Sequence, residues 1–130
     1  MNIAPQLNLA YIKIKRLLKH HTIEQIIDYI TQNQLIVFDC EDNLNNDQYS
    51  ALFETIINFC KRIDKKNSCL ISSIIYANIM SFLGVETTIN IGIVLHEGRK
   101  HAHAWIDKID ISPLEIVYIV KTYPIPISTK

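Results

Sequence analysis

Two residue types that could act together as nucleophile and base occur in separate parts of this 130-residue chain. Cys69 follows the helix-breaking residues 65–68 and precedes a helical apolar pattern, so we expect it in the first turn of a helix. Unpaired amides and the positive end of a helix dipole favour an anion there, which predicts a lowered thiol pKa. Cys60 lies inside the apolar stripe of an earlier predicted helix and is expected to be buried. The sequence therefore favours Cys69 as a nucleophile.

The segment from His101 to Trp105 supplies a candidate base. Side chains alternate across a predicted strand here, so His101, His103 and Trp105 share one face and two alanines share the other. The small alanines would allow this strand to pack closely against the Cys69 helix. A cysteine peptidase needs an imidazole within hydrogen-bonding reach of its thiol, to accept the proton and return it to the leaving amine. We therefore expect His103 to be the general base.

An acid that orients the imidazole would complete a catalytic triad. Three carboxylates follow His103 closely enough to do this: Asp107, Asp110 and Glu115. Each feature alone also has a structural interpretation, since a cysteine is often a small buried hydrophobe and a strand histidine is often a satisfied polar residue. The order of the features, a cysteine at a helix start and then a strand histidine beside a tryptophan, favours catalysis.

Helices are expected to occupy the first two-thirds of the chain. Their predicted ranges are 9–20, 22–30, 47–62 and 69–83. Thr22 and Gln25 form a capping-box pattern at the start of the second helix, Ser68 is the expected cap of the fourth, and Gly84 is its expected left-handed terminator. The short apolar segment 35–38 is either a strand or a buried connection.

Beyond Gly84 the composition shifts to β-branched residues, which predicts strands over 87–95, 100–107 and 115–123, with turns at 96–99 and around Ser112-Pro113. The predicted fold class is α+β, with N-terminal helices and a small antiparallel sheet against which the Cys69 helix packs. We divide the chain into an N-terminal helical region, 1–66, and a catalytic core of helix and sheet, 67–130, within one compact domain.

The bulk composition excludes several classes of protein. Thirteen lysines and arginines balance thirteen aspartates and glutamates, so the chain lacks the basic footprint of a nucleic-acid binder. No apolar run is long enough to cross a membrane, and the N-terminus does not have the pattern of a signal peptide. Three cysteines form neither a disulfide framework nor a zinc motif, so we expect reduced thiols and a cytoplasmic protein without a cofactor.

Four segments, in this order, resemble the leader peptidases of lasso-peptide biosynthesis, which are compact relatives of the transglutaminase-like and papain-like cysteine enzymes. The segments are 67–73, 83–85, 91–94 and 102–107, the last reading Ala-His-Ala-Trp-Ile-Asp. The resemblance implies a transglutaminase/papain-like core, with Cys69 as nucleophile and His103 as general base. At the position of the family's third member it implies Glu115, with Asp110 as a rival.

The same resemblance implies a function in antibiotic (lasso-peptide) maturation. The chain would remove the leader from a ribosomally synthesised precursor peptide before a lasso cyclase closes the ring, and would work with a separate small leader-binding protein. Two other readings stay open. One is a catalytically silent transglutaminase-like peptide-binding protein, and the other is a metal-binding protein that uses the following ligands: His96, His101, His103 and Glu115.

Overall fold

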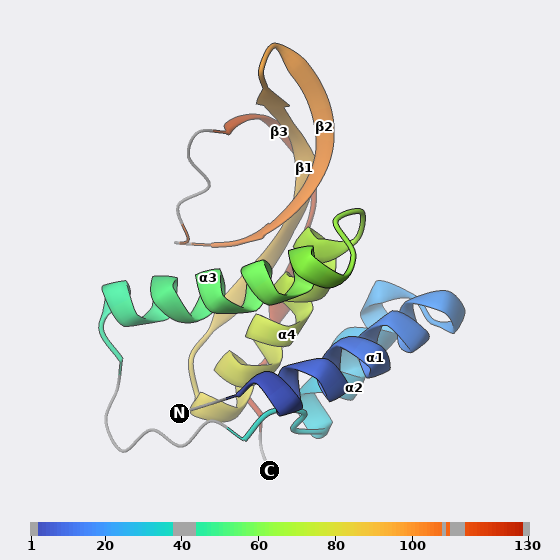
Figure 1. Cartoon of the computed structure of the whole chain (residues 1–130), viewed down its shortest axis with the longest axis vertical. Coiled ribbons are helices and arrows are strands. Elements are labelled where there is room, and N and C mark those ends of the chain that lie inside the picture. Colours follow the sequence, from blue (N-terminus) through green and yellow to red (C-terminus); the bar gives the residue numbers. More distant parts are fainter. Residues whose placement is uncertain (1–2, 38–43, 108, 110–113, 129–130) are drawn as a thin grey trace.

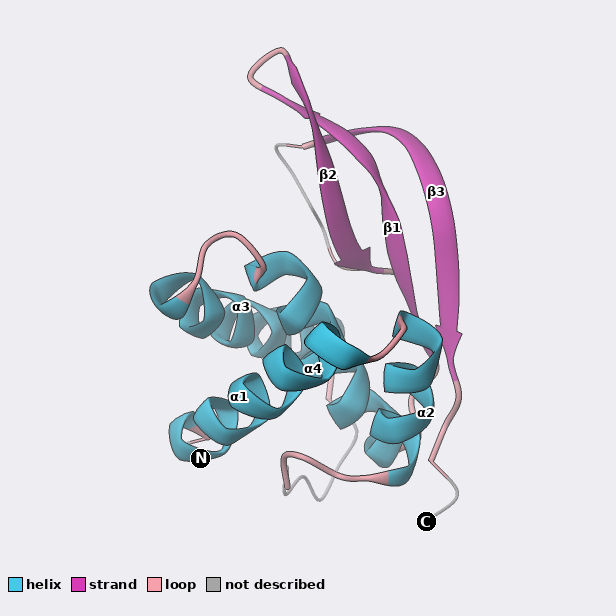
Figure 2. Cartoon of the chain, turned by 90° about the vertical axis from the view of Figure 1, so that its right-hand side faces the viewer, coloured by secondary structure: helices cyan, strands magenta, loops and turns pink. Residues whose placement is uncertain are grey.

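The computed structural model describes residues 3–37, 44–107, 109 and 114–128 (Figure 1). Within these ranges the elements are four helices, α1 (Ala4–His20), α2 (Ile23–Gln32), α3 (Asn46–Ile63) and α4 (Ser68–Leu83), and three strands, β1 (Thr87–His96), β2 (Arg99–Ile106) and β3 (Glu115–Ile125). The strands form an antiparallel sheet beside the helices, and its hairpin end extends beyond them (Figures 1 and 2). The predicted α+β class is confirmed.

Helix α4 is the centre of the fold. Every residue from Ile71 to Ser81 is buried, because this helix is apolar around its whole circumference rather than along one stripe. Its buried polar residue Asn78 is fully paired: its side chain accepts from Leu35 N at 3.0 Å and donates to Ile30 O at 2.7 Å and Asn33 O at 2.9 Å. These bonds fasten the end of α2 and the following segment to α4.

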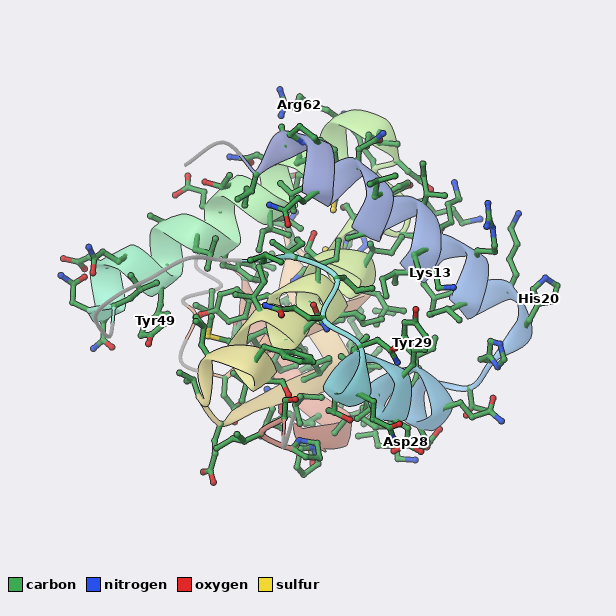
Figure 3. The ribbon with its side chains drawn as sticks, turned by 90° about the horizontal axis from the view of Figure 1, so that it is seen from below. Lys13, His20, Asp28, Tyr29, Tyr49 and Arg62 are labelled. Carbon is green, nitrogen blue, oxygen red and sulfur yellow. The ribbon has the colours of Figure 1, made fainter. Side chains whose placement is uncertain are left out.

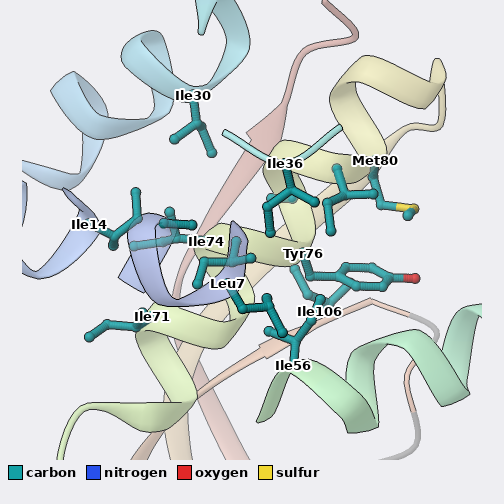
Figure 4. Packing of buried hydrophobic residues seen from close by; sticks show 14 of the residues in the cluster. Leu7, Ile14, Ile30, Ile36, Ile56, Ile71, Ile74, Tyr76, Met80 and Ile106 are labelled. Carbon is teal, nitrogen blue, oxygen red and sulfur yellow. The ribbon is translucent and has the colours of Figure 1, made fainter. Parts of the chain in front are cut away.

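One hydrophobic core takes residues from all the helices and strands described above (Figure 4). It surrounds α4, with α1, α2 and α3 on one side and the sheet on the other. The boundary that we drew between residues 66 and 67 therefore does not separate two cores, because α4 packs against elements on both sides of it. The charged side chains of α1, α2 and α3 point outward, among them Lys13, His20, Asp28 and Arg62 (Figure 3).

Most helix ends follow from local sequence. The capping box at Thr22 is confirmed, with Gln25 N donating to Thr22 Oγ1 at 3.2 Å, and Gly84 ends α4 in the left-handed conformation at φ 77°. Helix α1 begins at Ala4, five residues earlier than predicted, because Pro5 is favourable in a first helical turn. Ser68 was wrongly predicted as a cap: it is the first residue of α4, and the cap position belongs to Asn67.

The strand order in the sheet is β2-β1-β3, so β1 is central and the other two strands are edges (Figure 2). A two-residue turn joins β1 to β2, with Glu97 at φ 53° and Gly98 at φ 75°, as tight hairpins require. β3 continues to Ile125, two residues beyond the predicted end, because Pro124 is tolerated in an edge strand. The turn expected around Ser112-Pro113 lies outside the described residues.

Residues 35–37 form an irregular connection rather than a strand, and the predicted burial holds for Ile36 alone, because Val37 is 62% exposed. Ile36 is fully buried in the core, and the backbone groups nearby are satisfied by side chains. Val37 N donates to Gln6 Oε1 at 2.7 Å, which joins this connection to α1. The connection therefore needs no strand partner to satisfy its backbone.

Candidate functional site

Cys69 lies in the first turn of α4 and is half-buried. No side chain caps this helix end: Ser68 Oγ donates back to Lys65 O at 3.0 Å, and Asn67 makes no side-chain cap bond. Ser73 Oγ donates to the carbonyl of Cys69 at 2.8 Å, which holds the turn in place. Cys69 therefore lies in a first turn whose amides receive no side-chain cap, and the predicted position at a helix start is confirmed.

The charge state of Cys69 differs from the prediction. Burial raises the pKa of the thiol, and this effect outweighs the nearby charge of Lys61 and a hydrogen bond with Ser68, which both lower it. The expectation of a lowered pKa was wrong. The free-energy cost of burying the thiolate is larger here than the stabilisation that Lys61 and Ser68 give it. In this conformation Cys69 is a neutral thiol near neutral pH.

Cys60 is buried in α3, as its position in the apolar stripe predicted. Burial also raises the pKa of its thiol, while a hydrogen bond with Ser72 lowers it. With no exposure and a place in the main core, this cysteine has a packing role. The third cysteine, Cys40, lies outside the described residues.

His103 lies on β2, where it pairs with Gly92 of β1 and stacks on Trp105. The two ring centroids are 6.1 Å apart and the planes differ by 20°. Burial lowers the pKa of His103, and the charge of Lys61 lowers it further. The imidazole is therefore held in its neutral form, which is the form that can accept a proton.

Cys69 and His103 share one neighbourhood but do not form a bonded pair. Helix α4 packs against β2, and Lys61 at the end of α3 acts electrostatically on both groups. No hydrogen bond joins Sγ to the imidazole within the described residues. His103 instead stacks on Trp105, on the same face of β2.

The structure separates Glu115 from His103. Glu115 pairs with Leu95 and His103 pairs with Gly92, with β1 lying between the two strands. Two strand spacings of about 4.8 Å and three residues of about 3.3 Å along the strand separate them, which is too far for a direct hydrogen bond. Asp110 lies outside the described residues. The third acid, Asp107, instead accepts a hydrogen bond from the Asn90 side chain at 2.5 Å.

Two residues near the site were missed by sequence reasoning. Lys61 lies on α3, a different element from Cys69 on α4 and His103 on β2, and no local pattern marks it. Asn90 could have been noticed, because it is a polar residue within the apolar middle of β1, where it is buried. Its hydrogen bond to Asp107 ties the end of β2 to β1 and helps to hold the Trp105 segment in register.

The histidines do not form a metal centre. His96 and His101 come near each other at the hairpin, with ring centroids 6.5 Å apart, while His103 stacks on Trp105 farther along β2. Across the described part of the chain, no three His, Cys, Asp or Glu side chains gather as a metal site would require. Of the three histidines of the sheet, His103 is half-buried, and His96 and His101 are exposed.

Comparison of the chain with protein-family models, with curated proteins and with solved structures gives no match. Within the described ranges, no helix has the length and apolar character needed to cross a membrane.

Proposed function

We propose that the chain is a cysteine peptidase with a transglutaminase/papain-like core, which removes the leader from a ribosomally synthesised precursor peptide during lasso-peptide maturation. The observation that carries the proposal is the half-buried thiol of Cys69 at an uncapped helix start, beside the strand that holds a neutral His103. The enzyme would act in the cytoplasm with a separate leader-binding protein and a lasso cyclase.

The proposed reaction uses two side chains and the first-turn amides of α4. His103 accepts the proton of Cys69 as the sulfur attacks the scissile carbonyl carbon, and the amides stabilise the resulting oxyanion. The imidazolium then gives its proton to the leaving amine as the C–N bond breaks. Water, activated by the same imidazole, hydrolyses the thioester and releases the second peptide.

This mechanism requires a conformational change before chemistry. The imidazole must move toward Sγ, because the two groups are not hydrogen-bonded in the structure, and catalytic hydrogen bonds often tighten only in the substrate complex. Glu115 and Asp110 are the candidate acids for orienting the imidazole. Glu115 would have to act across β1, through intervening groups, since the strand pairing keeps it away from His103.

A catalytically silent peptide-binding protein is the second candidate, and one observation favours it. Burial raises the pKa of Cys69, whereas an activated nucleophile has a lowered one. In a silent protein the thiol would remain a packing group, and the exposed surfaces of the sheet would bind peptide without cleaving it.

Alkylation by iodoacetamide, followed by peptide mapping, distinguishes the two candidates. For the peptidase we expect Cys69 to react near pH 7 about tenfold or more faster than buried Cys60, and His103→Ala to remove that advantage. His101→Ala is the matched control, because it removes an exposed histidine from the same strand. It should leave the rate unchanged.

The pH dependence of the Cys69 alkylation rate shows which result would contradict the peptidase proposal. A silent protein would show a Cys69 rate that rises only at alkaline pH and is the same in wild type and His103→Ala, because the thiol would ionise alone. That result would overturn the peptidase proposal. Cys69→Ala and Cys60→Ala complete the series: the first should abolish leader cleavage with the fold intact, and the second should lower stability and spare cleavage.

A further inference from the structure

Strand β3 presents an apolar surface that the helices leave uncovered. Five consecutive residues are each between 43% and 62% exposed: Ile116, Val117, Tyr118, Ile119 and Val120. They lie on an open edge of the sheet, at the end that extends beyond the helices (Figure 2). The register against β1 places Tyr118 on the face of Ile93, and Ile116 and Ile119 on the other face, so both faces of β3 are apolar and exposed here.

This pattern is unusual for an edge strand. A continuous apolar run is typical of a strand covered on both faces, and exposed edges are normally protected by charges or proline. The five-residue run contains neither. β3 does have one protective feature, which is the twist introduced by two bulges relative to β1. An apolar edge of this length is expected to be covered by another strand.

The charges that flank the run are self-complementary. Glu115 precedes it and Lys121 follows it, and Tyr118 lies at its midpoint. In an antiparallel pair related by a twofold axis, one residue of each copy must lie opposite itself. If that residue is Tyr118, Glu115 of each copy lies opposite Lys121 of the other, and the apolar residues between them pair with one another.

We propose that a second copy of this chain pairs antiparallel with β3, centred on Tyr118, to form a twofold dimer with one continuous sheet. The flanking charges point to a second copy because they match each other in this register. Lys121 already contacts Glu24 of α2 at 2.9 Å, and both side chains are more than half exposed. Its ammonium has three donors, so it can contact the second copy's Glu115 as well.

The other edge of the sheet is not suited to the same contact. The exposed part of β2 begins with Arg99, Lys100 and His101, which are charged or polar residues of the kind that discourage strand pairing. Pairing through β3 would also leave β2 and His103 accessible, because β1 lies between the two edges. The proposed dimer is therefore independent of the proposed peptidase activity.

The test is the oligomeric state of the full chain by sedimentation equilibrium over a wide concentration range. We expect a reversible dimer, with Val120→Lys raising its dissociation constant about tenfold or more, because a lysine would be placed in the apolar centre of the pairing. Leu9→Lys is the matched control: it adds the same charge at a residue of α1 that is 69% exposed and should leave the dimer unchanged.

Charge reversal tests the register and the identity of the occupant. Glu115→Lys and Lys121→Glu should each weaken the dimer about three- to tenfold, because each places two like-charge contacts in it, and the double variant should restore it to within about twofold. Circular dichroism checks that each variant folds. A double variant no tighter than the single variants overturns the Tyr118-centred pairing.

Two further outcomes overturn the proposal. One is a wild-type chain that stays monomeric at every concentration. The other is a monomer whose β3 instead binds a different protein or an extended peptide, in a manner that Val120→Lys abolishes. That result would mean that β3 pairs with this protein or peptide and not with a second copy of the chain.

Discussion

The two edge strands of the sheet differ in how their side chains are distributed. β2 begins with exposed charged and polar residues and ends in the buried residues Ala104, Trp105 and Ile106. β3 begins with an exposed apolar run and is buried only at Ile125. Both strands start at the end of the sheet that extends beyond the helices (Figure 2). At that end the exposed residues are charged or polar on β2, whereas on β3 they are mainly apolar.

The helices explain the difference in burial. α4 packs against β2 and β1, while β3 is contacted chiefly by α2 near its C-terminal end. β2 therefore packs against a helix of the same chain along its buried end, whereas the apolar run of β3 stays exposed. Substitutions on the two edges should consequently have different effects.

Removing the buried aromatic of β2 should have the largest effect. Trp105 is 6% exposed and stacks on His103, so Trp105→Ala is expected to lower the free energy of unfolding by about 3–5 kcal/mol. Urea denaturation followed by circular dichroism measures this loss. His101→Ala, at the exposed end of the same strand, should change stability by no more than about 0.5 kcal/mol. Similar losses in the two variants would show that β2 is not anchored through Trp105.

A methyl group at Gly92 should have the next largest effect, because it would push both edges away from β1. An added Cβ would lie 2.5 Å from Tyr118 O, 3.0 Å from Ile119 Cα and 3.1 Å from a ring carbon of Trp105. Two of these atoms are backbone and cannot move alone, so Gly92→Ala should cost about 1–3 kcal/mol.

The same denaturation experiment measures this cost. Thr122→Ala, at an exposed residue of β3, is the control and should be close to neutral. A neutral Gly92→Ala variant would mean that β3 is not held as closely against Gly92 as the structure indicates.

The smallest effect concerns the titration of His103. Burial and Lys61 lower its pKa below the ordinary value near 6.5, so the unfolded chain binds the proton more tightly than the folded chain. Its contribution to stability is complete above about pH 6.5 and is lost as the pH falls through the interval down to the folded pKa. His103→Gln should flatten the dependence of unfolding free energy on pH in this interval.

Thr122→Ala provides the comparison for that measurement. It changes an exposed residue of β3 that does not titrate, so it should leave the pH dependence as it is in the wild type. Equal flattening by the two variants would show that the burial of His103 does not control the titration.

Several features of the fold could be predicted because they depend on neighbouring residues. The capping box at Thr22, the left-handed terminator at Gly84 and the hairpin turn are examples, and each is confirmed in the structure. The burial of Cys60 followed from its place in an apolar stripe. The cap of α4 could not be assigned as easily, since Asn67 and Ser68 are both common caps.

The candidate site was predicted only in part. The positions of Cys69 at a helix start and of His103 on a strand follow from local patterns, and both are confirmed. Their catalytic roles remain predictions. The effect of Lys61 on the pKa of Cys69 and of His103 could not be foreseen. It depends on how α3 packs beside α4 and not on any sequence spacing.

By itself, then, the sequence determined the helices and strands, the α+β class, the burial of Cys60 and the position of Cys69 at a helix start. Only the tertiary structure decided the strand order, which places β1 between His103 and Glu115, and the direction of the Cys69 pKa shift. It also decided that the apolar run of β3 is exposed. The physical reason is that capping, periodicity and turns act between neighbours in the chain. Strand pairing and desolvation act between residues that only folding brings together.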